Sequence, residues 1–469
     1  MDFNDLLKID RDEDILKYKF SNSDLSMYFT VRAFIFDSTI KNNFNQTSFS
    51  QNDNKIKLKK KFEYLFWGSV KNIFFSKRKP IYFFTSEVLF YQKDGQFLNK
   101  LYEGIFENFK KYINTVSTKT IKKIKTPKKQ NVYYSDIIFE ISKLVSTLKK
   151  LKKEDENSIR ELIEKLESKS KINLTMNQFK FLENWLQELS KIRGVIHFIY
   201  NIFFKLKKPK LIIIEDAHYL GDKAFIIEAA KQNKIITAEF QHGYIGRTHY
   251  AYNYHIKIFS KIKEVLPDFF LTFGSFWGEK IRTPSKIVTI GHSEINNYFE
   301  KITLKKSDKK KILVISNSFE TDELFDLCNS ILNSVLKNKF ELLIRPHPLE
   351  RDFFKKQFES LINNGFNLDQ NDNIYETLID TEVIISLQNS TVLYESIFFT
   401  KRIFLKNSKI SNFKEHNGNF IMFSDFKELE EHIIKGDKIN LKLSDVWEKN
   451  YVKNFYSFLM DNNIIKKSY

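Results

Sequence analysis

Cysteine is almost absent from this sequence, which has one cysteine, Cys328, among its 469 residues. A single thiol excludes an internal disulfide and a cysteine-based zinc cluster, and it fits a reducing compartment. Long apolar stretches are also missing, since no uninterrupted run approaches the roughly 20 residues of a membrane-spanning helix. The residues from Met1 to Asp5 lack the basic start and apolar core of a secretory signal. We therefore expect a cytoplasmic protein that is soluble or, at most, peripheral on the cytoplasmic face of the inner membrane.

Two common phosphate-binding fingerprints are missing as well. The sequence contains neither the Walker A pattern nor the dinucleotide fingerprint G-x-G-x-x-G, which argues against a P-loop ATPase and a standard NAD enzyme. No cluster of histidine and acidic residues has the spacing of a metal site. We therefore expect neither a metal nor another cofactor.

The charge balance favours anionic partners. The net charge is +18, with 42% hydrophobic and 29% charged residues, so the chain combines a sizeable core with a basic surface. Such a balance fits nucleic acid, an anionic membrane face or acidic substrates, and a merely lysine-rich solvated surface is the alternative. The lysine cluster from Lys119 to Lys129 lacks interleaved aromatic residues, and no nucleic-acid motif is present. We therefore expect no nucleic acid as a partner.

Length and strand pattern predict two α/β domains. A chain of this length exceeds the usual limit of a single core. From Leu211 onward, short apolar strands alternate with helices, which predicts parallel sheets with right-handed crossovers. After a linker at Ser307–Lys311 the alternation restarts. We expect a Rossmann-like domain over 1–305 with a helical insertion at about 119–200, a second over 306–440, and a helix over 441–469 that packs back on the first domain.

The first third of the chain is less regular. Residues 79–86 predict a buried strand, Asp94-Gly95 a turn, and 97–112 a helix. Residues 133–188 have mainly helical spacing, and residues 27–40 fit either a helix or a strand.

The segment Arg345-Pro346-His347-Pro348 follows an apolar strand. Its two prolines fix the backbone around His347 and keep that histidine out of a regular helix or strand. A histidine presented so rigidly suits a phosphate, with Arg345 adding positive charge. A turn histidine without a ligand is the alternative.

A second anion site is predicted after the strand at 383–385. Ser390 and Thr391 would cap the following helix, whose free amides and two hydroxyls attract an anion. Glu395, about one turn further on, is placed to bond a ribose or base. Ser316 ends another strand of the same half and joins this donor-binding set. An ordinary helix cap is the alternative.

The first half offers a candidate catalytic base. His242 precedes Gly243 after a strand, and an unperturbed histidine titrates near pH 6.5, as a general base requires. Asp216, with Glu215 beside it at another strand end, is the rival base, although such a pair also serves as a helix cap or ion pair. Three further residues on the His242 loop are candidates for binding an acidic acceptor: Arg247, His249 and Tyr250.

These motifs resemble those of two-domain, GT-B type bacterial glycosyltransferases that build capsule and lipopolysaccharide. The His347-Pro348 pair and the later Ser390-Thr391 are similar to the donor half of the bacterial sialyltransferases, where such residues contact the CMP moiety. That family has two acids followed by glycine, whereas Ala217 follows the acids here. The pairing of His242-Gly243 with Pro346-His347-Pro348 also resembles the teichoic-acid-type polyol phosphate transferases. The resemblance covers roughly residues 211–425.

The resemblance implies two Rossmann-like domains facing a cleft and an inverting, metal-independent transferase. It would move a sugar from a nucleotide-activated donor, with a CMP-linked, sialic acid-like donor favoured, to a growing capsule or lipopolysaccharide glycan. The acceptor would be an anionic or lipid-linked glycan. A CDP-polyol phosphotransferase, a basic nucleic-acid-binding protein and a catalytically silent partner of a polysaccharide complex are the alternatives.

Overall fold

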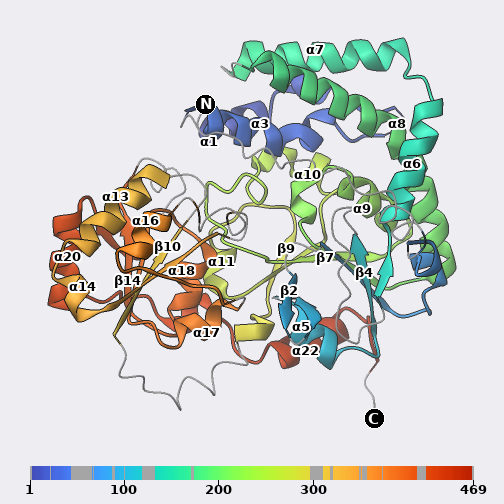
Figure 1. Ribbon diagram of the computed structural model, residues 1–469. Helices are drawn as coiled ribbons and strands as arrows, with labels where there is room; N and C mark the ends of the chain where they lie inside the picture. The colour runs from blue at the N-terminus through green and yellow to red at the C-terminus, as the bar shows by residue number, and fades with distance from the viewer. Residues whose placement is uncertain are drawn as a thin grey trace.

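The computed structural model describes residues 3–21, 23–43, 66, 68–86, 90–93, 95–99, 101–118, 132–170, 174–295, 310–316, 321–347, 350, 356, 358–371, 373–408 and 419–466. Two parallel sheets, each covered by helices on both faces, form the body of the molecule (Figure 1). The α/β prediction with two Rossmann-like domains is therefore confirmed.

The first sheet has seven parallel strands in the order β5-β4-β1-β6-β7-β8-β9. Their bounds are β1 Ile81–Ser86, β4 Ile113–Thr118, β5 Val132–Tyr134, β6 Leu211–Ile214, β7 Ile236–Phe240, β8 Phe269–Thr272 and β9 Lys286–Thr289. The strand order reverses between β1 and β6, and ligands of open α/β sheets bind at the carboxyl side of such a switch point.

The second sheet has six parallel strands in the order β12-β11-β10-β13-β14-β15. Their bounds are β10 Lys311–Ile315, β11 Glu341–Arg345, β12 Asn367–Leu368, β13 Val383–Ser386, β14 Arg402–Lys406 and β15 Ile421–Phe423. Its order reverses between β10 and β13, so the second switch point lies where these two strands end.

Strand alternation distributes the core over three layers. In β1, Tyr82 and Phe84 face one apolar cluster, whereas Ile81 and Phe83 face another. The second cluster continues without a break to Leu313 of β10, so one apolar layer joins the two sheets. A third cluster covers the outer face of the second sheet under α13, α16 and α20. These helices, with the smaller α14, span α13 Thr321–Leu332, α14 Leu336–Lys339, α16 Glu359–Asn363 and α20 Phe426–Lys435.

A helical excursion stands on the first domain, as predicted for its N-terminal half (Figure 1). It consists of α6 Asp136–Leu148, α7 Lys153–Ser170 and α8 Met176–Lys207. Helix α8 begins with a capping box, in which Thr175 and Gln178 satisfy each other's backbone amides. The N-terminal helices α1 Phe3–Ile9, α2 Glu13–Leu16 and α3 Met27–Asn43 pack against this excursion. None of the described helices is both long and apolar enough to cross a membrane.

Smaller helices fill the connections of the two sheets. They are α5 Glu103–Asn108, α9 Lys223–Gln232, α10 Phe259–Ile262, α11 Ser275–Gly278, α17 Ile374–Leu378 and α18 Thr391–Ser396. The single helix predicted over 97–112 is wrong, because β2 Phe90–Lys93 and β3 Gln96–Asn99 form a hairpin around Gly95 and only α5 is helical. The Asn99 side chain accepts from the amides of Leu101 and Tyr102, which turns the chain before α5 begins.

The C-terminal segment crosses between the domains. It forms two helices, α21 Leu443–Val446 and α22 Tyr451–Asp461, because Trp447 is extended and ends the first helix. Asn450, just before the second, has a left-handed backbone with a φ of 60°. The indole of Trp277 donates to the carbonyl of Val446 at 2.9 Å, and the indole of Trp447 donates to that of Tyr394 at 3.0 Å. The segment thereby bonds both the first domain and α18 of the second.

Candidate functional site

The loops that follow β7 and β13 meet where the two sheets face each other. A Cβ atom built on Gly243, after β7, would lie 3.5 Å from Oγ1 of Thr391, the first residue of α18. Next to this contact, the rings of Tyr244 and Tyr394 stack with centroids 5.6 Å apart. The predicted catalytic loop and part of the predicted donor loop are therefore neighbours.

His242 forms an acid–histidine pair with Asp216. Its Nδ1 lies 3.1 Å from Oδ1 of Asp216, which follows β6, and the two side chains are 20% and 29% exposed. Asp216 adopts a left-handed conformation with a φ of 57°, which aspartate tolerates better than most residues. Among the described residues, Nε2 of His242 has no hydrogen-bond partner. Glu215, which precedes Asp216, is buried. Of these two acidic residues, Asp216 is therefore the one that solvent reaches.

Glu239 is a site residue that was not among the predicted ones. It lies fully buried in β7, where its Oε1 accepts from the hydroxyl of Tyr252 at 2.7 Å and lies 3.7 Å from Nδ1 of His242. The Tyr252 hydroxyl also lies 3.3 Å from Nδ1 of His242. A glutamate inside an otherwise apolar strand was the one sequence signal, because a buried carboxylate needs partners.

The other carboxylate oxygen of Glu239 binds His218. Oε2 accepts from the His218 amide at 2.8 Å and bonds its ring Nδ1. The ring Nε2 of His218 lies 3.0 Å from the Ser285 hydroxyl, in the loop before β9. Glu239, in β7, is therefore linked to the segment after β6 and, through His218, to the loop before β9.

Gln241 fixes the backbone around the candidate base. Its amide nitrogen donates to the carbonyl of Gly243 at 2.9 Å, and its Oε1 accepts from the amide of Phe273 at 3.0 Å. Since Gln241 is fully buried, these bonds tie the His242 loop to the end of β8.

Tyr102 places a hydroxyl beneath the same strand ends. The residue is 1% exposed, and its ring packs on Phe83 and Phe240. Burial, followed by the charges of Glu215 and Asp216, raises the pKa of Tyr102 well above its usual value. Among the described residues none accepts or donates a hydrogen bond to this hydroxyl.

The predicted acceptor residues lie on the loop that follows His242. His249 contacts the Tyr219 hydroxyl through Nε2 at 3.3 Å, and the ring of Tyr250 packs edge-on against that of Tyr219. Tyr219 in turn lies beside the ring of His242, with centroids 5.9 Å apart. Arg247 is exposed on the same loop.

In the second domain, Glu350 connects two predicted donor-binding residues. Its Oε2 accepts from the amide of His347 at 2.9 Å and from the hydroxyl of Ser316 at 2.7 Å. Burial raises the pKa of Glu350. The His347 segment after β11 is thereby anchored to the end of β10, at the switch point of the second sheet. Pro348 lies outside the described residues.

Arg345 occupies a buried position instead of facing the loops. Its Nη1 forms an ion pair with Oδ2 of Asp369, and the two side chains are 9% and 2% exposed. The Thr377 hydroxyl also donates to this carboxylate at 2.9 Å. The charge of Arg345 is therefore balanced within the domain, an arrangement that the sequence did not reveal because the partner is 24 residues away.

Ser390 stands at the N-cap position of α18, but its side chain makes no capping bond. Its Oγ is buried and has no hydrogen-bond partner within the described part of the chain. Glu395 is buried within the same helix. The Ser390 hydroxyl is thus a buried donor and acceptor near the Gly243–Thr391 contact.

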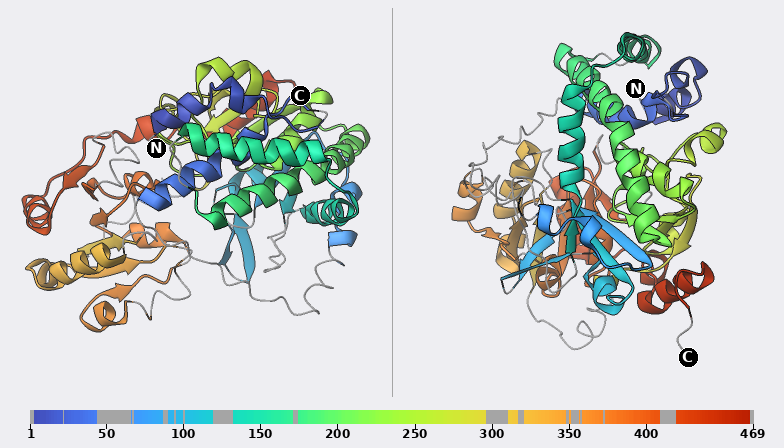
Figure 2. Two further views of the ribbon diagram at one scale, coloured as in Figure 1. Left: turned by 90° about the horizontal axis from the view of Figure 1, so that it is seen from above. Right: turned by 90° about the vertical axis from the view of Figure 1, so that its right-hand side faces the viewer.

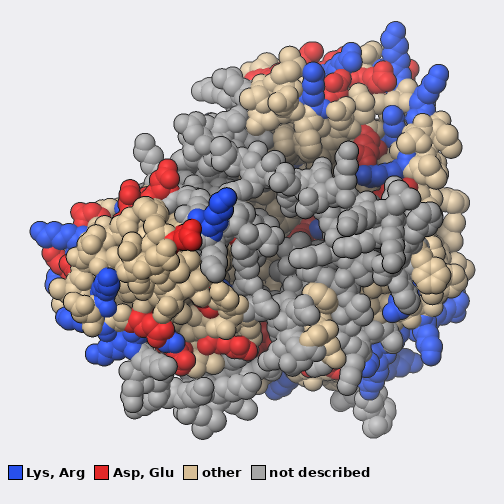
Figure 3. Space-filling view, viewed as in Figure 1, with Lys and Arg blue, Asp and Glu red and all other residues tan. Residues whose placement is uncertain are grey.

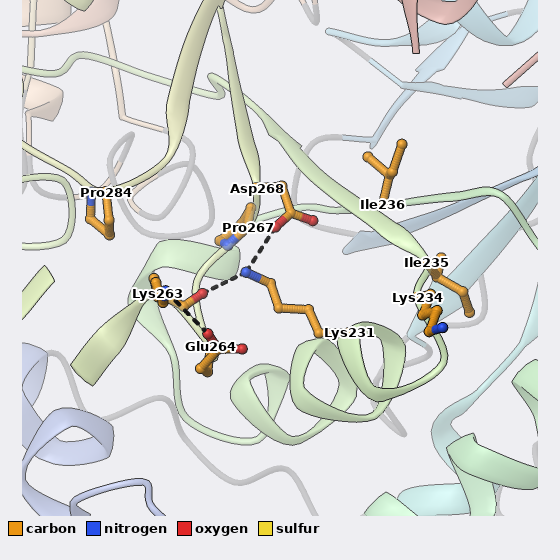
Figure 4. A pocket seen from close by; sticks show the side chains of 9 residues that line it. All are labelled: Lys231, Lys234, Ile235, Ile236, Lys263, Glu264, Pro267, Asp268 and Pro284. Carbon is orange, nitrogen blue, oxygen red and sulfur yellow. Dashed lines mark hydrogen bonds and ion pairs between the residues drawn. The ribbon is translucent and has the colours of Figure 1, made fainter. Parts of the chain in front are cut away.

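An open pocket of about 520 Å³ lies on the side of the first sheet where its strands begin (Figure 4). Ile236 at the start of β7 and Asp268 just before β8 line it, so it lies at the amino ends of these strands. Lys231 pairs there with Asp268 at 2.9 Å. Ligands of such sheets bind at the opposite, carboxyl ends, and the predicted residues lie there. Within the described residues, no group of three or more histidine, cysteine or acidic side chains is arranged to hold a metal ion.

No family model and no curated protein matches this sequence. Solved structures are similar in fold. The UDP-GlcNAc 2-epimerase from Methanocaldococcus jannaschii has 11% identity and a TM-score of 0.46, over 81% of this chain and 99% of its own. The UDP-GlcNAc 2-epimerase from Neisseria meningitidis has 12% identity and a TM-score of 0.45, over 81% and 98%. A UDP-forming α,α-trehalose-phosphate synthase from Burkholderia vietnamiensis has 10% identity and a TM-score of 0.41, over 82% and 97%.

Proposed function

We propose that this chain is a glycosyltransferase that moves a sugar from a nucleotide-activated donor to a bacterial capsule or lipopolysaccharide glycan. The observation that carries the proposal is the contact between the two domains at Gly243 and Thr391. Through this contact a candidate base, His242, lies near the hydroxyls of Ser390 and Thr391. These follow β13, a strand at the switch point of the second sheet, where a nucleotide would bind.

His242 supplies the base in this proposal. The Asp216 carboxylate, 3.1 Å from Nδ1, favours a proton on that nitrogen and leaves Nε2 unprotonated, so Nε2 takes the proton from the acceptor hydroxyl. The oxygen of that hydroxyl attacks the anomeric carbon as the bond from that carbon to the donor phosphate breaks, and the nucleotide leaves with the electron pair. Asp216 then stabilises the imidazolium. Attack opposite the leaving group inverts the anomeric configuration.

The second domain would hold the donor phosphate. His347, positioned through its amide by Glu350, and the hydroxyls of Ser390 and Thr391 offset the charge that develops on the leaving nucleotide. Arg345, whose Nη1 pairs with Asp369, would add positive charge near the phosphate. We favour a CMP-linked donor on the motif resemblance, with no metal or other cofactor. The basic charge favours an anionic or lipid-linked acceptor and association with an anionic membrane surface.

A CDP-polyol phosphotransferase is the second candidate, favoured by the pairing of His242-Gly243 with Pro346-His347. Both reactions release CMP, so the products decide between them. Transfer of a polyol phosphate leaves phosphorus in the polymer, whereas transfer of a sugar from a CMP-linked donor leaves none.

The first test is the thermal stability of the purified chain with CMP, UDP, GDP or ADP. A ligand at about 100 times its Kd stabilises the folded state by about 2.7 kcal/mol, which shifts Tm measurably. We expect CMP to raise Tm for the unchanged chain and for His432→Ala, a control on α20, but not for His347→Ala. A shift with UDP or GDP alone would show that the donor is linked to that nucleotide instead of CMP. No shift with any nucleotide would reject the proposal of a transferase.

A further inference from the structure

Helix α6 carries an apolar stripe that faces solvent. Its buried side is formed by Ile138, Ser142 and Ser146. On another side, large aliphatic residues recur at the spacing of one helix face, and they are Ile141, Leu144, Val145 and Leu148. Leu144 and Leu148 are 66% and 84% exposed. The helix is therefore apolar on a side that the described part of the chain leaves exposed.

The neighbouring helix α8 also carries exposed apolar residues. Helices α6 and α8 pack against each other and lie side by side on the outside of the molecule (Figure 2, right). Phe198, Ile202 and Leu206 recur every four residues on α8 and are 63%, 38% and 50% exposed. We use the name α6–α8 patch for seven of these exposed residues, which are Ile141, Leu144, Val145, Leu148, Phe198, Ile202 and Leu206. Large exposed apolar side chains on two neighbouring helices are typical of an interaction site.

Lysines border the patch at both ends. Lys149, Lys150, Lys152 and Lys153 are exposed where α6 passes into α7, and basic side chains are visible at that corner (Figure 3). Lys205 and Lys208 are exposed at the end of α8. None of these six lysines forms an ion pair with a described residue, so their charges are available to an anionic partner.

We propose that the α6–α8 patch docks the protein on an anionic phospholipid bilayer. The aliphatic and aromatic side chains enter the boundary between headgroups and acyl chains, while the lysines bind lipid phosphates. A second copy of the same patch would oppose lysine to lysine, which disfavours self-association. The inference extends the membrane association proposed above and rests on it, and it assigns that association to a defined surface.

Flotation of the full chain with lipid vesicles tests this assignment. We expect binding to vesicles of phosphatidylcholine and phosphatidylglycerol in equal parts, weak binding to phosphatidylcholine alone, and release by salt. Lys149→Gln with Lys150→Gln should weaken binding about thirty-fold, since each lysine near an anionic surface contributes a factor of about five to six. Leu144→Ser with Leu148→Ser should abolish it. Both pairs are exposed, so Tm should not change.

The matched control is Ile434→Ser with Lys435→Gln on α20, which removes an exposed isoleucine and a lysine from the second domain. It should bind vesicles like the unchanged chain. Equal binding to both vesicle types, or full binding by the leucine variant, would overturn the inference. A lipid-free dimer that the leucine variant dissociates would assign the patch to a second copy instead. The nucleotide-induced Tm shift should persist in every patch variant, which separates failure of this inference from failure of the transferase.

Discussion

Gly243 of the first domain lies against Thr391 of the second, with room between them for little more than a methyl group: a Cβ on Gly243 would lie 3.5 Å from the Thr391 Oγ1. This spacing is ordinary van der Waals contact, so Gly243→Ala should fold and keep most of its activity. Gly243→Val carries two further methyl groups into the contact. We expect it to lower kcat/KM at least about tenfold, because a small displacement of reacting groups has large kinetic effects.

Steady-state kinetics of the two variants, with Tm measured in parallel, check this expectation. Gly221→Ala is a poor control because Gly221 has a φ of +62°. Gly194→Ala, inside α8, has open space around it and should leave kcat/KM unchanged, with stability raised by up to about 1 kcal/mol because alanine favours a helix interior. Equal kcat/KM for Gly243→Val and the unchanged chain would show that the contact does not border the reacting groups.

The pair of His242 and Asp216 leads to a second prediction. His242→Ala removes the proposed base and should lower kcat by about 10² to 10⁴, the usual contribution of general base catalysis. Asp216→Asn keeps the shape but loses the charge that stabilises the imidazolium, so kcat should fall less. Because the two residues act as one unit, the double variant should be little worse than His242→Ala alone.

Two measurements on the three variants separate a role in catalysis from a role in nucleotide binding. The rate of product formation reports on catalysis, and the Tm shift caused by nucleotide reports on binding. The shifts should survive in all three, since none of them touches the second domain. His255→Ala, on a loop elsewhere in the first domain, is the control. A His242→Ala variant with unchanged kcat would remove His242 from the proposed mechanism.

The strand ends that form the site were predictable from sequence because buried parallel strands read as continuous apolar runs. Leu211–Ile214 is such a run, and Ile236–Phe240 is one interrupted by Thr237 and Glu239. The polar residues that follow them, Asp216 and His242, lie together as expected of neighbouring carboxyl ends. The shortest strands, β12 with two residues and β5 and β15 with three each, are too short to show a period.

Partners across long sequence separations could not be predicted. Glu239 and His218 are 21 residues apart and belong to different strand ends, so only the register of β6 with β7 brings them together. The same holds for Glu350, whose bond to Ser316 spans 34 residues. A single sequence shows that a buried acid needs a partner but not which residue provides it.

The ion pair of Arg345 and Asp369 should matter for stability. Arg345→Ala leaves a buried carboxylate with only neutral donors such as Thr377, and we expect a loss of about 3 kcal/mol in the free energy of unfolding. Arg160→Ala breaks an exposed pair with Glu183 and should cost less than about 1 kcal/mol. Urea unfolding measures both.

Removing both charges of the buried pair provides the internal control. Arg345→Ala with Asp369→Ala should be more stable than Arg345→Ala alone, because no unpaired carboxylate remains. A loss no larger than that of Arg160→Ala would show that solvent or another residue compensates Asp369.

The buried Glu350 predicts a pH dependence of stability. Burial raises its pKa in the folded chain above the usual value of 4.5, so the folded state binds its proton more tightly than the unfolded state. The stabilisation from this proton is complete below pH 4.5 and is lost as the pH rises through the raised pKa of the folded state. Glu350→Gln should therefore show a smaller decrease of Tm over this range, while still accepting bonds from Ser316 and His347.

Scanning calorimetry at a series of pH values compares Glu350→Gln with the unchanged chain and with Glu359→Gln on α16, whose pH dependence should match that of the unchanged chain. Parallel pH curves for Glu350→Gln and the unchanged chain would show that Glu350 titrates alike in both states.

The buried hydroxyl of Tyr102 gives a prediction of opposite sign to most core substitutions. It has no hydrogen-bond partner among the described residues, and an unsatisfied buried polar group costs about 1–3 kcal/mol. Tyr102→Phe keeps the ring contacts with Phe83 and Phe240 and removes that cost. We therefore expect the free energy of unfolding to rise by about 1 kcal/mol.

The matched comparison is Tyr28→Phe, which is equally buried but donates its hydroxyl to Asp10 at 2.9 Å. That variant should lose stability by about 1 kcal/mol, because a carboxylate then lacks a donor. If Tyr102→Phe is instead destabilised like Tyr28→Phe, water or a ligand must bond the Tyr102 hydroxyl in solution.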